Sequence, residues 1–301
     1  MKLLILTAIT ISILHFLTLP SYIAVLAKKT QMICQEMTPA FSESRSTISS
    51  LVCGKKIADP KHIFALQSTG LIHIFVVSAG HLVVISEFLA FIKWPRFFIT
   101  FVLFVFTLIT GLQAPCLRSL MALLIGYFLS HRKLILSGPQ LVFLTGILTL
   151  ALFPQWSQSF SLQLSWAAAL ALSITSLFRN RNHSSLQNMI ITSFCVFIVL
   201  LPFMQRLGGL HPLTILWNIT LGTLTAFLLF PLSILAFLNP FFLNILEFMM
   251  KPFWSILKLS DEFRFEPSSS SSNLLMGWAW ILILHLLLHF TALFYQRTYK
   301  T

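Results

Sequence analysis

Long apolar runs separated by short polar turns dominate the chain. A run of about 20 apolar residues is long enough for a helix to cross the hydrocarbon layer of a membrane. Because an unpaired backbone amide is costly in lipid, each run is predicted to be helical. The predicted spanning helices cover residues 3–27, 64–92, 97–113, 115–130, 134–153, 159–177, 188–205, 213–238 and 274–296. A weaker run at 240–260 contains Glu247, Lys251, Pro252 and Lys258, and it either crosses or lies in the interface.

This pattern predicts an all-α, polytopic membrane helix bundle with nine or ten transmembrane helices. The segments are an anchor at 1–27, an extracytoplasmic loop at 28–63, a membrane domain at 64–260, a polar Ser-rich linker at 261–273, and a C-terminal helix with a tail at 274–301. The anchor also suits a signal peptide, because Lys2 precedes an apolar run that ends at Ala27. Its length of about 25 residues favours an uncleaved anchor.

Composition narrows the function classes. Residues of the set AVILMFWYC make up 57% of the chain and charged residues only 9%, which excludes a soluble enzyme. No carboxylate occurs in the 159 residues between Glu87 and Glu247. Coupled transporters usually bury a carboxylate in the membrane, and paired-carboxylate acid–base chemistry needs two. Paired-carboxylate chemistry is therefore excluded from this part of the chain, which also lacks the carboxylate that coupled transport usually uses.

The basic residues lie in alternate connections between the predicted helices. One set of connections contains Lys93, Arg96, Arg132, Lys133, Arg179 and Arg181, whereas the other contains only Arg206. The positive-inside rule places the first set in the cytoplasm. We therefore expect a multi-pass protein of the cytoplasmic (inner) membrane, with residues 28–63 outside.

Two cysteines, Cys34 and Cys53, lie in this outer segment. An oxidising compartment would allow a disulfide between them, which is worth about 3 kcal/mol in the chain-entropy model. Two unpaired thiols are the alternative. Cys116 and Cys195 fall inside apolar runs and are predicted to be small core residues.

Several signatures of enzyme sites are absent from the sequence. It contains no G-x-x-x-x-G-K-[ST], no H-E-x-x-H and no paired C-x-x-C, so we expect no enzyme activity, cofactor or metal site. Ser78 and His81 could share a helix face, but nothing nearby resembles an oxyanion site. His73 lies about 12 Å from His81 along a continuous helix, so both could bind one ion only if the helix breaks at Gly80.

The stretch from Thr69 to Leu82 places polar groups inside an apolar run. They are Thr69, His73, Ser78 and His81, and Gly70 and Gly80 lie beside them. In lipid such groups need partners or water. Two interpretations stay open: a broken element that lines an aqueous path, or hydrogen bonds that hold helices together.

Arg118 is the one charge well inside the carboxylate-free part of the chain. It follows a predicted helix break at Gly111 and Pro115. A guanidinium at this depth must face a cavity or an acceptor. It either caps carbonyls of the broken helix or contacts phosphate, which its planar geometry suits.

Two further segments carry polar side chains in apolar runs. Small residues recur every four positions in the helix predicted at 159–177, which is typical of a packing stripe; they are Ser161, Ser165, Ala169 and Ser173. Gln163 lies on another face and is a better pore candidate. Asn218 lies in the run at 213–238, with Pro231 further along.

These motifs resemble the ComEC family of DNA-uptake channels, specifically its membrane-embedded competence domain. The family signature T-G-L-x-H…S-G-x-H is matched by Thr69, Gly70, Leu71, His73, Ser78 and His81, with Ala79-Gly80 as the two residues after the serine. Gly54 fits an upstream apolar-Gly element. Three later blocks follow in family order. The first matches at Gly111, Pro115, Arg118 and Met121, and the third at Asn218 and Pro231. The second matches at Pro154, Phe160, Gln163, Leu164, Ser165 and Ala168. Two departures are Phe153, where the family usually has Asp, and Thr223, near the place of a missing proline.

The resemblance implies a channel that passes single-stranded DNA through the membrane during natural transformation. The residues expected to line or support the path are His73, Ser78, His81, Arg118, Gln163 and Asn218, and those expected to shape it are Gly70, Gly80, Pro115, Ser165 and Pro231. Family members often add an OB-type module and a metallo-β-lactamase-like nuclease domain. Here the outer segment is too short for the first, and no H-x-H-x-D-H marks the second.

Separate proteins would then supply the nuclease, the DNA receptor and the cytoplasmic helicase. Two other functions stay open. One is a transporter or flippase for a different anionic or lipid-linked substrate, and the other is a membrane scaffold without a pore. The sequence leaves the oligomeric state undetermined.

Overall fold

A computed structural model describes residues 2–38, 42–75, 78–178, 184–207, 214–260 and 274–298. These residues form helices joined by short turns, and none of the described residues lies in a strand. The all-α prediction is therefore confirmed. The Ser-rich stretch at 261–273 lies outside the described residues, and so do Arg179 and Arg181, which were predicted to be cytoplasmic.

The first helix, α1 (Lys2–Met37), is longer than the predicted anchor. It continues through ten residues that were expected to form a loop, and these include good helix formers such as lysine, glutamine, glutamate and methionine. The rest of the segment at 28–63 contains α2 (Ser42–Leu51) and the start of α3 (Pro60–Ser68). The segment is thus largely helical rather than an open loop.

The predicted helix at 64–92 is wrong as one continuous element. The chain there forms α3, a single turn α4 (Ile72–Phe75) and α5 (Ala79–Phe91). Gly70 adopts φ +73°, a left-handed conformation that ends α3, and a Cβ at this position would lie 2.6 Å from Thr214 Cγ2. The run of apolar residues therefore conceals a broken element.

The following apolar runs form helices close to their predicted bounds. They are α6 (Arg96–Ile109), α7 (Ala114–His131), α8 (Gly138–Leu152), α9 (Phe160–Phe178), α10 (Ser185–Leu207), α13 (Phe241–Ser260) and α14 (Leu274–Thr298). A short 3-10 helix, η1 (Pro154–Gln158), precedes α9. The run at 213–238 is continuous but irregular, because two π-helical stretches, η2 (Asn218–Gly222) and η3 (Thr225–Leu229), lie between α11 (Thr214–Trp217) and α12 (Phe230–Leu238).

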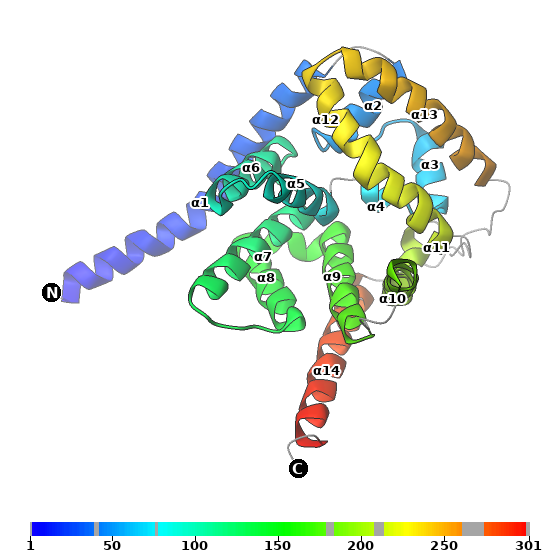
Figure 1. Cartoon of the computed structure of the whole chain (residues 1–301). Coiled ribbons are helices and arrows are strands. Elements are labelled where there is room, and N and C mark those ends of the chain that lie inside the picture. The colour runs from blue at the N-terminus through cyan, green and yellow to red at the C-terminus, as the bar shows by residue number, and fades with distance from the viewer. Residues whose placement is uncertain are drawn as a thin grey trace.

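The helices form two packed groups (Figure 1). In one, α12 and α13 pack against α2, and α13 also contacts α3. Its core includes Phe75, Leu82, Phe230 and Phe253. In the other, α9 packs against α8, α10 and α14, around a core that includes Trp166. Helices α5 and α7 connect the two groups, since α5 contacts η3 next to α12, α7 contacts α8 and α9, and α5 and α7 contact one another.

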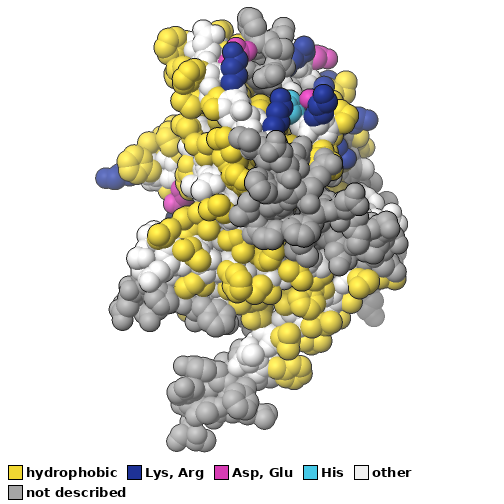
Figure 2. All heavy atoms as spheres, turned by 90° about the vertical axis from the view of Figure 1, so that its right-hand side faces the viewer, with side chains coloured by type: hydrophobic (Ala, Val, Ile, Leu, Met, Phe, Trp, Pro, Cys, Tyr) yellow, Lys and Arg dark blue, Asp and Glu magenta, His cyan; other side chains and the backbone are white. Residues whose placement is uncertain are grey.

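Four stretches of the described residues are long and apolar enough to cross a membrane: Ala114–His131, Ser185–Phe203, Thr214–Leu238 and Leu274–Thr291. Shorter apolar helices accompany them at Ala79–Phe91, Arg96–Ile109, Gly138–Leu152 and Phe160–Ser176. On the face shown in Figure 2, most charged side chains gather over its upper part, and the lower part exposes mainly hydrophobic side chains. This division is typical of a protein embedded in lipid. The number of crossings and the crossing of α13 stay predictions.

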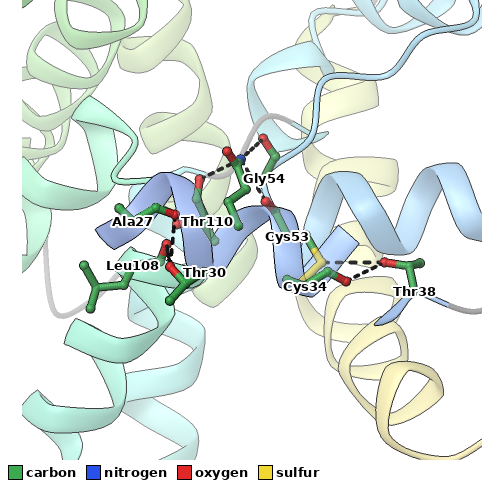
Figure 3. Close-up of a disulfide and its surroundings, with 9 residues drawn as sticks. Ala27, Thr30, Cys34, Thr38, Cys53, Gly54, Leu108 and Thr110 are labelled. Carbon is green, nitrogen blue, oxygen red and sulfur yellow. Dashed lines mark hydrogen bonds between the residues drawn. A yellow bond between two sulfur atoms is a disulfide. The ribbon is translucent and has the colours of Figure 1, made fainter. Parts of the chain in front are cut away.

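A disulfide (Figure 3) fixes α1 to its neighbours, and so does a hydrogen-bonded glutamine. Cys34 and Cys53 form the disulfide, with their Cα atoms 5.7 Å apart. Gln31 Nε2 donates to the carbonyls of Cys53, Gly54 and Thr110 at 3.0, 3.2 and 3.2 Å. A Cβ on Gly54 would lie 2.5 Å from the Thr110 carbonyl oxygen, so only glycine fits there. These contacts join α1, the end of α2 and the turn between α6 and α7.

Candidate functional site

A cavity of about 460 Å³ lies where α5 begins, between that helix, α7, α9 and α12. Its wall includes residues that the sequence predicted to act together: Ser78, Gly80, His81, Pro115, Arg118 and Ser165. Ser161, Ala169 and Phe230 also line it, together with further apolar side chains. We call this space the Arg118 cavity.

The break before α5 gives the Arg118 cavity a helix N-terminus. Ser78 is the N-cap of α5, and its hydroxyl oxygen accepts the Gly80 N–H at 3.3 Å. The Ser78 N–H donates in turn to His81 Nδ1 at 3.0 Å. Because Nδ1 accepts this bond, the neutral imidazole carries its proton on Nε2. The partial positive charge of the α5 N-terminus therefore lies at the cavity wall.

His81 holds this cap in place from a buried position. Its side chain is 3% exposed, and its ring meets Phe230 edge-on at a centroid distance of 4.3 Å. The ring nitrogen near the Ser78 hydroxyl already accepts a backbone N–H. This is the geometry of a helix cap rather than of an activated serine nucleophile.

Arg118 contributes a buried positive charge to the cavity. Its side chain is 4% exposed, and its Nε donates to Ser165 Oγ at 3.1 Å. Within the described part of the chain, no carboxylate pairs with it and no hydrogen-bond acceptor meets its two terminal nitrogens. It therefore caps no helix carbonyl among these residues, which removes one of the two roles predicted for it. A guanidinium with so few partners is suited to binding an anion.

On α9, the residue predicted to line a path packs against another helix, and two residues predicted to pack line the cavity. Gln163, the predicted pore residue, is 1% exposed and donates from Nε2 to the Leu274 carbonyl at 2.9 Å. It therefore packs α14 onto α9 and does not line the Arg118 cavity. Ser161 and Ser165, which were predicted to form a packing stripe, line the cavity instead.

The remaining predicted residues lie elsewhere. Asn218 is in the π-helical stretch η2, and its Oδ1 is buried with no hydrogen-bond partner among the residues described. It lies near Gly70, where a Cβ would be 3.8 Å from Asn218 Nδ2. Pro231 begins α12 and lines a different space. His73 is in α4, and its side chain lies outside the described set.

Neither the position of Phe230 in the cavity wall nor that of Ser161 was predicted from the sequence. Phe230 was one phenylalanine among 30, and no local pattern marks it as the ring that meets His81. The signal for Ser161 was present in the stripe of small residues. Such a stripe allows close packing, but it equally leaves space beside the helix.

The described residues contain no group of three or more metal-ligating side chains. The Arg118 cavity has a guanidinium, hydroxyl groups and a helix N-terminus, all of which favour an anion. The expectation of no enzyme activity stays a prediction.

Comparisons with known proteins give one match. Residues 51–298 match the model of a family described as "Competence: Competence protein". No curated protein matches the chain. No solved structure matches it either.

Proposed function

Because this chain belongs to the competence protein family, we propose that it conducts single-stranded DNA across the cytoplasmic membrane during natural transformation. The proposal includes the orientation with Lys93 and Arg132 on the cytoplasmic side, as the positive-inside rule predicts. It also assigns the nuclease, the DNA receptor and the cytoplasmic helicase to separate proteins.

The observation that carries this proposal is the buried Arg118 guanidinium at the wall of a cavity within apolar helices. Single-stranded DNA presents a phosphodiester anion at every nucleotide, and a guanidinium binds such groups well. The carboxylate-free stretch between Glu87 and Glu247 removes the side chains that would repel a polyanion. Charge and position thus both favour a phosphate chain.

The dimensions of the Arg118 cavity limit how the strand would pass. Its volume of about 460 Å³ is in the range of pockets that hold one small molecule. The cavity therefore serves as a station for one nucleotide unit at a time. Phosphate would meet Arg118 and the N-terminus of α5, while the sugar and base contact Ala169 and Phe230.

Deletion of the gene in the organism that encodes it tests the proposed function. We expect the frequency of transformation by added DNA to fall to background, because the strand has no other route through the membrane. Plasmid introduced by electroporation is the control, since it bypasses the channel and should be established at the normal frequency. Unchanged transformation in the deletion strain would contradict the proposal, and a defect in a lipid-linked product would favour the flippase alternative.

A further inference from the structure

A second and larger space, of about 920 Å³, lies between α1, α5, α6 and α12. We call it the apolar groove. Its wall is formed by aliphatic and aromatic side chains, including Phe88, Phe106 and Ile234, together with Thr30 and Glu87. It shares Phe230 with the Arg118 cavity but none of the polar residues of that site.

The lengths of the helices explain why this space exists. Helices α5 and α6 contain 13 and 14 residues, so each is about 20 Å long. That is shorter than the roughly 30 Å of hydrocarbon that a spanning helix must cross. The neighbouring α1 has 36 residues. Short helices beside a long one leave a recess with apolar walls, and in a bilayer acyl chains are the material that fills such a recess.

The groove contains one charged side chain, Glu87. The other polar wall residue, Thr30, is internally satisfied, because its hydroxyl donates to the Leu108 carbonyl at 2.9 Å. Glu87 is exposed, and within the described ranges no cation lies in ion-pair distance of it. A carboxylate beside apolar walls at membrane depth is costly unless a cation joins it. The complement of this groove is therefore an apolar chain that carries a cationic group.

Two cationic side chains follow α5 in the sequence. Lys93 is exposed and lies in the turn that follows α5, where its backbone has φ +60°. Arg96 begins α6, with its guanidinium 5.6 Å from the centre of the Tyr127 ring. A zwitterionic headgroup has an ammonium and a phosphate a few atoms apart. Its ammonium can pair with Glu87, and the cations that follow α5 favour its phosphate.

We propose that the apolar groove binds one glycerophospholipid with a primary ammonium headgroup, of the phosphatidylethanolamine class. The ammonium pairs with Glu87, and an acyl chain lies along Phe88, Phe106 and Ile234. The bound lipid fills the space that the short helices α5 and α6 leave between α1 and α12. This inference does not depend on the passage of DNA.

Native mass spectrometry of the full-length protein after removal of lipid tests this inference. The added lipids are phosphatidylethanolamine, phosphatidylglycerol and N-acetylated phosphatidylethanolamine, all with the same acyl chains. We expect the wild type to retain the first about tenfold better than the other two, because only it offers an ammonium to Glu87. In Glu87→Gln the preference should disappear. Comparing three lipids on the wild-type protein keeps the test valid even if a variant folds poorly.

Two further variants serve as controls. Glu247→Gln removes a carboxylate of α13 that does not line the groove, so it should keep the wild-type preference. Val105→Phe narrows the groove and should lower retention of every lipid. Equal retention of the three lipids by the wild type would overturn the proposal. So would an unchanged preference in Glu87→Gln, or a dimer or captured helix that covers the groove and excludes lipid.

Discussion

Replacement of Arg118 by alanine is expected to lower the transformation frequency about 100-fold while the protein stays in the membrane at its normal level. Arg118 is 4% exposed and lines a cavity in which, among the described residues, only Ser165 accepts one of its hydrogen bonds. Removing it leaves the phosphate chain without a cation at this depth. The measurement is the number of transformants per cell, with an immunoblot of the membrane fraction.

Matched variants separate charge from folding. Arg118→Lys keeps the charge but loses the planar fork, so it should fall between alanine and the wild type. Arg132→Ala removes an exposed arginine after α7, and Lys133 keeps a positive charge in that turn, so this variant should transform normally. Full transformation by Arg118→Ala would remove Arg118 from the path.

Cys53→Ser is expected to lower the free energy of unfolding by about 3 kcal/mol, and the Tm in detergent by about 6–12 °C. The disulfide with Cys34 is buried, and it lies beside the carbonyls that Gln31 Nε2 holds. Its loss frees the end of α2 from α1. Thermal unfolding followed by circular dichroism measures the change, and a reductant should shift the wild type in the same direction.

Cys195→Ser provides the comparison for this variant. Cys195 is a free, partly exposed thiol on α10, so its replacement should change the Tm little. If Cys53→Ser unfolded at the wild-type temperature, the disulfide would not stabilise the fold. Equal destabilisation by both variants would indicate a general effect of replacing cysteine by serine.

The sequence predicted the helices where one apolar run corresponds to one helix, as in α6, α7 and α8. It failed where local chemistry interrupts a run. The break between α3 and α5 had local signals, namely a glycine that ends a helix at Gly70 and a capping residue at Ser78. The sequence therefore left a broken element at Thr69–Leu82 as one of two open interpretations, because neither residue changes the hydrophobicity of the segment. The extension of α1 beyond Ala27 had local support in its helix-forming residues, whereas the contacts of Gln31 with Gly54 and Thr110 join residues that are distant in the sequence.

Part of the candidate site could be predicted, because a polar side chain in an apolar helix is costly and therefore marks a possible site. That reasoning identified Ser78, His81 and Arg118, and the structure brings these three to one cavity. The same reasoning could not tell which face of α9 lines the cavity and which packs against α14. The hydrogen-bond partner of Gln163 is the carbonyl of Leu274, 111 residues away in the sequence. A buried amide that packs helices and one that lines a path have the same sequence signal.

Solvent and DNA access to the Arg118 cavity tests the central claim most directly. In a background of Cys116→Ser and Cys195→Ser, the variants Ser161→Cys and Gln163→Cys are treated with a small cationic thiol reagent that does not cross membranes. The account predicts that Ser161→Cys reacts, that a single-stranded oligonucleotide slows its reaction, and that Gln163→Cys stays unreactive beneath α14. An inert Ser161→Cys, or one whose reaction the oligonucleotide leaves unchanged, would contradict the account.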